Sequence, residues 1–121
     1  MAKALGTWLL GDKLKDLIYH VKNPDGTYKD LTGHTVKLEG RRYGDHALSI
    51  DVTGTVDPDQ VTVGSTPSTT TRGKVTFSDI TTGITLAKRS QTFEARVRVT
   101  LTAGSLPGWT KPFDITVEQW P

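Results

Sequence analysis

The sequence predicts an all-β fold, a single antiparallel β-sandwich of about seven short strands without a disulfide bond. Three observations lead to this prediction. Apolar and polar residues alternate with a period of two along several segments, which is typical of strands with one buried face. Turn residues recur about every eight to twelve positions, and no segment shows the apolar spacing of an amphipathic helix. The 121 residues include 20 threonines, 12 glycines and 6 prolines but no cysteine, a composition that suits strands and turns.

The chain begins with an N-terminal arm, residues 1–10, in which residues 5–10 predict an edge strand. Residues 17–22 predict the next strand, because apolar side chains fall on alternate positions. A turn follows at residues 23–26, Asn-Pro-Asp-Gly. Proline fixes φ at the second position of such a turn, and glycine accepts a positive φ.

The middle of the chain predicts two further strands and a polar loop. Residues 34–42 and 47–53 alternate apolar and polar side chains on either side of a turn at residues 43–45. Residues 54–73 predict a long polar loop, because a segment this rich in Ser, Thr and Gly cannot bury enough apolar area to hold its own conformation. We expect this loop to be either mobile or held by a neighbouring protein. A short strand at residues 73–77 follows it.

The clearest strand pattern lies in residues 92–102, where apolar side chains alternate with Thr, Glu and Arg. This pattern is typical of a central sandwich strand with one wet face. A last strand over residues 109–120 forms a hairpin with it. The alternation predicts a core made of Leu17, Tyr19, Val21, Val36, Leu38, Leu48, Ile50, Val52, Phe77, Phe93, Val97, Val99, Ile115 and Val117.

Composition and charge exclude several functional classes. The net charge is only +2, and the basic residues are scattered, so the positive stripe of a nucleic-acid-binding protein is missing. No stretch reaches the length of a membrane span, and the N-terminus lacks the continuous apolar region and cleavage site of a signal peptide. We therefore expect neither a nucleic acid nor a membrane as a partner.

Residues with catalytic or metal-binding chemistry are sparse. His20, His34 and His46 lack the i, i+2 or i, i+4 spacing that presents two imidazoles to one metal, and no cysteine adds a ligand. Asp57-Pro58-Asp59 offers two carboxylates to a calcium ion, but the further ligands of a calcium loop are missing, and a plain turn is favoured. No Gly-x-Ser-x-Gly elbow or phosphate-binding loop is present. We expect no catalytic residue, no cofactor and no metal.

Both ends of the chain carry a recognisable series of motifs. The first series is Gly11-Asp12, an alternating strand, Asp25-Gly26, a Leu31-Thr32-Gly33 corner and a second strand; the closing series is an alternating strand, a glycine-bearing loop and a final strand ending at Val117. This pattern resembles the N-terminal domain of the phage baseplate-upper-protein family, although residues 54–72 are longer and richer in threonine. The resemblance implies an immunoglobulin-like sandwich that mounts tail and baseplate parts on a virion. The Cys…Trp…Cys core of true immunoglobulin domains is absent, so the likeness concerns architecture only.

Several residues are candidates for contact with neighbouring proteins. Trp8 and Trp120 lie near the termini, where one domain offers little core, and aromatic residues are enriched at interface hot spots. Packing of the terminal edge is an equal alternative for both tryptophans. The polar loop and the outward face of the strand at residues 17–22 complete the set. The predicted interface residues are Trp8, Ile18, His20, Ser65, Thr66, Thr69, Thr70, Thr71 and Trp120.

The first functional hypothesis is a structural virion protein of a tailed bacteriophage, made in the host cytoplasm and catalysing nothing. It would be an adaptor or decoration subunit that contacts other virion proteins and copies of itself. The family favours the tail or baseplate, whereas the short stand-alone length favours the neck or the capsid surface. The alternative is a carbohydrate-binding β-sandwich module with weak glycan contact. Such modules expose rows of aromatic residues, whereas the outward faces here carry Thr, Lys, Glu and Arg. A small hydrolase has no supporting residue cluster.

Overall fold

The chain folds into strands joined by turns and loops. The computed structural model describes residues 3–11, 15–61, 70–82, 84, 86, 88–101 and 108–119, and over these residues it contains nine strands and no helix. The described residues therefore include no helix long and apolar enough to cross a membrane. The strands are β1 (Lys3–Leu9), β2 (Leu17–His20), β3 (His34–Arg42), β4 (Ile50–Thr53), β5 (Thr55–Val56), β6 (Lys74–Phe77), β7 (Ser90–Leu101), β8 (Gly108–Trp109) and β9 (Phe113–Glu118).

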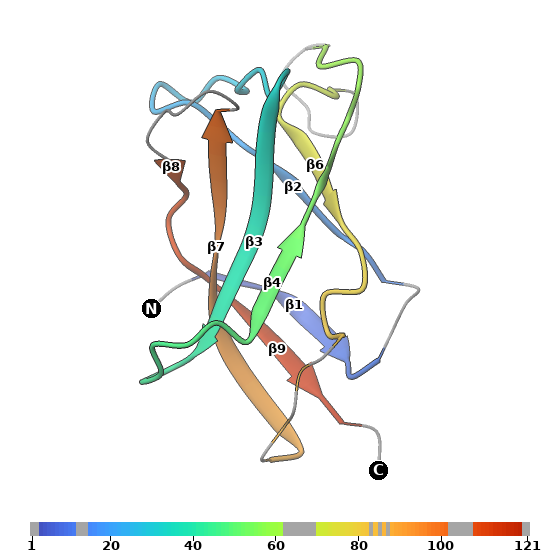
Figure 1. Ribbon diagram of the computed structural model, residues 1–121, viewed down its shortest axis with the longest axis vertical. Helices are drawn as coiled ribbons and strands as arrows, with labels where there is room; N and C mark the ends of the chain where they lie inside the picture. Colours follow the sequence, from blue (N-terminus) through green and yellow to red (C-terminus); the bar gives the residue numbers. More distant parts are fainter. Residues whose placement is uncertain are drawn as a thin grey trace.

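The strands form two sheets that share one hydrophobic core (Figure 1). The larger sheet has six strands, in the order β1-β9-β7-β3-β4 with β8 also paired to β7. Within it, β1 runs parallel to β9, and the other pairs are antiparallel. The smaller sheet is antiparallel with the order β2-β6-β5. The all-β prediction is confirmed, and the two layers make the molecule sandwich-like.

The hairpin predicted at the end of the chain is present, but its second strand is interrupted. Arg98 on β7 lies opposite Trp109 on β8, whereas Ala95 lies opposite Phe113 on β9, so one extra residue is inserted between the two pairings. Thr110 follows β8 at this irregularity and stays attached to β7, because its N–H donates to the carbonyl of residue 97 (3.0 Å). This arrangement is a β-bulge, which bends the strand and splits the predicted segment 109–120 into β8 and β9.

The strand predicted at residues 47–53 begins later than expected, which overturns one core assignment. The N–H of Ser49 donates to the carbonyl of Gly40 (2.8 Å), and β4 starts only at Ile50. Leu48 therefore belongs to the connection between β3 and β4, and it is 49% exposed instead of buried. The other predicted core residues are buried, except that Tyr19 and Val52 are half-buried and pack against the core.

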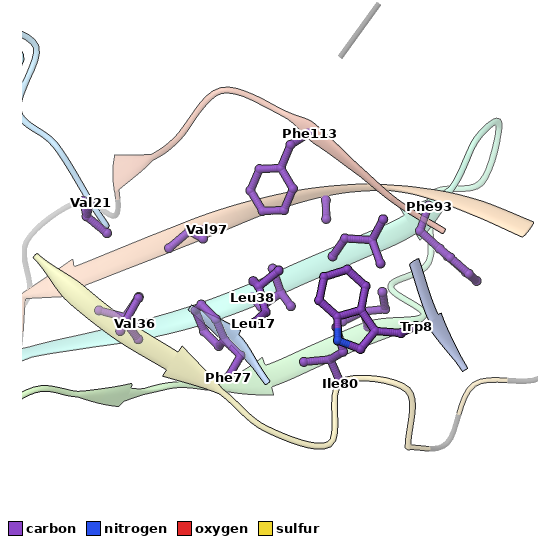
Figure 2. Close-up of a cluster of buried hydrophobic side chains, with 14 of the residues drawn as sticks. Trp8, Leu17, Val21, Val36, Leu38, Phe77, Ile80, Phe93, Val97 and Phe113 are labelled. Atoms are coloured by element: carbon purple, nitrogen blue, oxygen red, sulfur yellow. The ribbon is translucent and has the colours of Figure 1, made fainter. Parts of the chain in front are cut away.

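The core lies between the two sheets and receives side chains from both. Figure 2 shows the indole of Trp8 pointing from β1 into this core, on the same side as Ile80, with Phe77 of β6 further along the cluster. The ring of Tyr19 on β2 stacks on that of Phe113 on β9, with 5.4 Å between the centroids. β2 therefore lies over β9, close to the side of the larger sheet that ends in β1.

Two Asp-x-Thr turns hold the connection between β2 and β3. Asp25 accepts hydrogen bonds from the hydroxyl of Thr27 (2.6 Å) and from its backbone N–H (3.0 Å). Asp30 does the same with Thr32, at 2.7 and 3.0 Å. The hydrogen bonds from the threonine hydroxyl and N–H groups lower the pKa of both carboxyl groups. Gly33, which has φ +75°, completes the second turn. The Asp25-Gly26 and Leu31-Thr32-Gly33 motifs of the sequence thus form turns in the structure.

Gly54 marks the crossover of the chain from β4 in the larger sheet to β5 in the smaller one. A Cβ at this position would lie 2.4 Å from Cγ2 of Val75 and 2.6 Å from Cε1 of Phe77. Both neighbours are fully buried, at 0% exposure, so neither has free space to move into. We expect Gly54→Ala to lower the free energy of unfolding by about 3 kcal/mol, since overpacking forces the core apart.

Urea denaturation measures the effect of Gly54→Ala, with Gly44→Ala as the control. Gly44 has φ +86°, and apart from its two chain neighbours no described residue has an atom within 4 Å of the position that a Cβ would take there. Its substitution should cost only the strain of the left-handed backbone, about 1 kcal/mol. Equal losses in the two variants would contradict the close approach of the crossover to the core.

Candidate functional site

The predicted interface residues do not form one surface. Ser65, Thr66, Thr69 and Trp120 lie outside the described residues. Of the others, Ile18 and His20 lie on the outer face of β2, and Ile18 is 56% exposed. Trp8 and Thr70 are buried, and Thr71 is half-buried.

Trp8 is a core residue, only 3% exposed. Its Nε1 donates to the carbonyl of Lys15 (3.1 Å), and Nζ of Lys15 lies 4.4 Å from the ring centroid. The ring is therefore covered by its own chain, and the prediction that Trp8 contacts a partner is wrong. The alternative, packing of the terminal edge, is the arrangement found. The parallel pairing of β1 with β9 brings this residue to the core, and nothing in the local sequence indicates that pairing.

The described part of the polar segment 54–73 is held by the chain itself, through one glutamine. Gln60 is 8% exposed. Its Oε1 accepts hydrogen bonds from the N–H groups of Leu31 (2.8 Å) and Gly73 (2.9 Å). Its Nε2 donates to the carbonyls of Asp57 (2.8 Å) and Thr71 (3.2 Å). One side chain thus joins three segments that are distant in sequence.

Thr70 completes this internal network. It is 2% exposed, and its hydroxyl donates to the carbonyl of Val61 (2.8 Å). The N–H of Thr71 donates to the same carbonyl (2.8 Å). The expectation that residues 54–73 need a neighbour to hold them is therefore wrong for residues 54–61 and 70–73, and Thr70 has no surface to offer a partner.

The outer face of the larger sheet carries a network of opposite charges. Its cross-strand ion pairs are Lys37–Asp51 (3.0 Å), Arg41–Glu94 (3.0 Å) and Arg98–Glu39 (3.6 Å). On β7, Arg96 is exposed and Arg98 is half-buried beside its carboxylate partner. This agrees with the wet or polar face that the alternation on β7 predicts. Ion pairs at the surface contribute at most about 1 kcal/mol each, so the network adds little to stability.

A hollow of about 330 Å³ opens on this charged face. It is lined by carboxylates and guanidinium groups of the network, together with His46, Leu48 and Pro112. The volume is at the lower end of the range for small-molecule sites. None of its described lining residues carries a hydroxyl or thiol, so the hollow lacks that kind of nucleophile. The exposed Leu48, which the alternation wrongly placed in the core, is part of it.

Tyr43 stands on the same face and is 55% exposed. Its hydroxyl donates a hydrogen bond to the carboxylate of Asp114 on β9. This hydrogen bond, with the negative charge of Asp114, raises the pKa of Tyr43 from 10.0 to about 12. The bond fixes the end of an exposed aromatic ring, a feature that strand periodicity does not reveal because Tyr43 lies in a turn.

The raised pKa of Tyr43 makes a testable contribution to stability. Since the protonated phenol is the donor, its contribution is complete below pH 10 and is lost as the pH rises through about 12. The pair is exposed, so we expect Tyr43→Phe to lower the free energy of unfolding by only about 0.5 kcal/mol at pH 8. Denaturant unfolding of both proteins at pH 8 and above pH 12 measures this. A difference that grows with pH would contradict the assignment of the phenol as donor.

The titratable side chains do not gather into a metal site in the part of the chain described. His20, His34 and His46 lie on three different segments, and no three His, Asp or Glu side chains come together in a way that could hold a metal ion. Asp57 accepts the N–H of Asp59 (3.0 Å), the geometry of a plain turn.

Two surfaces could take part in binding. One is the hollow near Tyr43, and the other is the edge of the smaller sheet formed by β2. Comparison with protein-family models, curated proteins and solved structures finds no match to the chain.

Proposed function

We propose that the chain is a structural protein of a tailed-bacteriophage virion, an immunoglobulin-like module at the tail, baseplate, neck or capsid surface. The strand order carries the immunoglobulin-like part of the proposal, whereas the virion role rests on the motifs of the sequence. β2, β6 and β5 have the order of strands B, E and D of an immunoglobulin domain, and β9, β7, β3 and β4 have that of G, F, C and C′. β1 adds a parallel strand beside β9.

The turn motifs add support from the sequence. The residues that resemble the baseplate-upper-protein family, Asp25-Gly26 and Leu31-Thr32-Gly33, form the turns between β2 and β3. In this proposal the chain contacts other virion proteins and copies of itself, needs no cofactor and catalyses no reaction. A cysteine-free domain with one core is suited to this role, because it folds before assembly without an oxidising compartment.

Quantitative mass spectrometry of gradient-purified particles tests the proposal. We expect peptides of this chain at a fixed ratio to the major capsid protein, at the same value in independent preparations. A non-structural protein of the same infected cells serves as the control and should be depleted by purification. If the chain is made during infection but is depleted like the control, the proposal is overturned.

The hollow favours a second candidate function, that of a carbohydrate-binding module. Leu48 and Pro112 offer apolar contact, the neighbouring carboxylates and guanidinium groups offer hydrogen bonds to hydroxyls, and exposed Tyr43 stands on the same face. A glycan array tests this function. Selective binding that is lost in Leu48→Ala and retained in Ile18→Ala, on the opposite sheet, would favour it over the virion role.

A further inference from the structure

β2 ends the smaller sheet (Figure 1), and among the described residues no strand pairs with its other side. The hydrogen bond from the N–H of Val21 to the carbonyl of Gly73 (2.8 Å) shows which residues of the strand point their backbone groups toward β6 and which point them away. Leu17 and Tyr19 therefore direct their N–H and C=O groups toward β6, whereas the carbonyl of Val21 accepts from the N–H of Lys29 (3.0 Å). The N–H and C=O groups of Ile18 and His20 point away from the sheet. No described residue hydrogen-bonds to these outward groups.

The other sheet edges are shorter or are protected. On β1, the carbonyl of Thr7 accepts a hydrogen bond from Lys15 Nζ (2.5 Å), and that of Leu9 accepts one from the hydroxyl of Thr81 (3.3 Å). β5 has only two residues. The middle of β4 carries Asp51, which is charged and paired with Lys37. Bound side chains, short strands and charges are the devices by which proteins prevent an edge from pairing.

β2 is also short, but it has neither the charge nor the bound side chains of the other edges. Its four residues, Leu-Ile-Tyr-His, carry no acidic or permanently charged side chain and favour strands. Ile18 is 56% exposed on its outer face. An uncharged edge with an exposed apolar residue is a ready template for another strand.

Beside β2, the larger sheet extends further than the smaller sheet. This difference limits the kind of partner that can pair with the edge of β2. Tyr19 stacks on Phe113 of β9, with 5.4 Å between the centroids, so β2 lies over β9. β1 continues the larger sheet one strand further, with half-buried Leu5 packed against the core. A second folded copy would bring a second layer about 10 Å from its own edge strand, where it would collide with β1. A single extended segment meets no such layer.

We propose that the edge of β2 accepts one extended strand from a neighbouring protein chain. The strand bonds to the N–H and C=O groups of Ile18 and His20 and becomes the fourth strand of the smaller sheet. Its inward side chains lie near Leu5 and half-buried Tyr19 and are therefore apolar, whereas its outward ones lie beside Ile18. Main-chain hydrogen bonds supply affinity in this mode of recognition, and alternate side chains supply specificity. This inference rests on the proposed function and names how the chain is held in the particle.

Amide hydrogen exchange in the wild-type protein tests the inference directly. In the free subunit, the amides of Ile18 and His20 should exchange rapidly, while that of Val21 is protected by its bond to Gly73. In purified particles the first two should slow by about tenfold or more. If the wild-type chain is present in particles and these amides exchange as fast as in the free subunit, the inference is overturned. Absence of the wild-type chain from particles instead overturns the proposed function, and the partner with it.

A pair of proline variants tests the same edge by assembly. Ile18→Pro removes an N–H that points away from β6, so the ladder of the smaller sheet stays intact, as for prolines on natural edge strands. Thr53→Pro is the matched control, because the bond from Gly54 N–H to the carbonyl of Val36 (2.8 Å) directs the N–H of Thr53 away from β3 in the same way. We expect Ile18→Pro to lower incorporation about tenfold and Thr53→Pro to leave it unchanged. Equal incorporation of both folded variants would overturn the inference; if Ile18→Pro does not fold, the exchange experiment decides.

Discussion

Val97→Asp should lower the free energy of unfolding by about 4 kcal/mol or more, the largest effect that we expect for a single substitution. Val97 lies on β7, within the larger sheet, opposite Leu38 of β3, and both side chains are 0% exposed. An aspartate there buries a carboxylate among apolar side chains with no cation beside it, and burial of an unpaired charge belongs to the most destabilising class of change.

Thermal and urea unfolding compare Val97→Asp with Arg96→Ser. Arg96 is the next residue on the same strand, but its side chain is on the exposed face. Its substitution should change the free energy of unfolding by no more than about 0.5 kcal/mol. If Val97→Asp unfolds like the parent and Arg96→Ser does not, the inward and outward faces of β7 are inverted.

Strands with one wet face could be predicted from the sequence. On β3, Val36 and Leu38 are buried, and the residues between and beside them are at least partly exposed. The period-two pattern survives because one face of this sheet meets the core and the other carries charges. The turn at residues 23–26 could also be predicted from the sequence. Gly26 adopts φ +90°, and its N–H donates to the carbonyl of Asn23 (2.9 Å).

The pattern fails where a strand ends or where pairing depends on distant residues. Leu48 has the parity of Ile50, but it precedes the first residue of β4, so the alternation no longer describes its direction. Trp8 lies in the core because β1 pairs with β9 at the other end of the chain. Neither fact has a local signal in the sequence.

The candidate surfaces were predicted only in part. The outward positions of Ile18 and His20 follow from the alternation of residues 17–22. Whether the backbone beside them is paired depends on the order of strands in the sheet, and periodicity carries no information about that order. The hollow likewise combines β3 and the β3–β4 connection with Glu94 on β7 and Pro112 before β9, segments that meet only in the folded chain.

Gln60 is the residue whose role was hardest to predict, and its removal should be nearly as destabilising as a buried charge. Gln60→Ala leaves the buried N–H groups of Leu31 and Gly73 without their acceptor, and the carbonyls of Asp57 and Thr71 without their donor. Each buried polar group left unsatisfied costs about 1–3 kcal/mol. We expect a total loss of about 3–5 kcal/mol in urea unfolding, because water entering the space restores part of the bonding.

A second variant separates the backbone of Gln60 from its side chain. The residue has φ +43°, in the left-handed region that is strained for any residue except glycine. Gln60→Gly removes the same hydrogen bonds but relieves this strain, so it should be less destabilising than Gln60→Ala by about 1 kcal/mol. If the alanine and glycine variants both unfold like the parent protein, the amide does not hold the three segments together.

Gln60→Glu tests whether the N–H donors of the amide are needed. The substitution keeps an acceptor for the N–H groups of Leu31 and Gly73, but it places a second carboxylate oxygen against the carbonyls of Asp57 and Thr71. Burial and these two carbonyls disfavour the charged carboxylate, so the folded-state pKa of the new carboxyl rises above its unfolded value. The variant should therefore be clearly less stable than the parent at pH 7, and the difference should shrink as the pH falls through that raised pKa, because the protonated carboxyl regains one donor. A variant as stable as the parent at pH 7 would mean that the hydrogen bonds donated by the amide to the carbonyls of Asp57 and Thr71 do not hold the segments together.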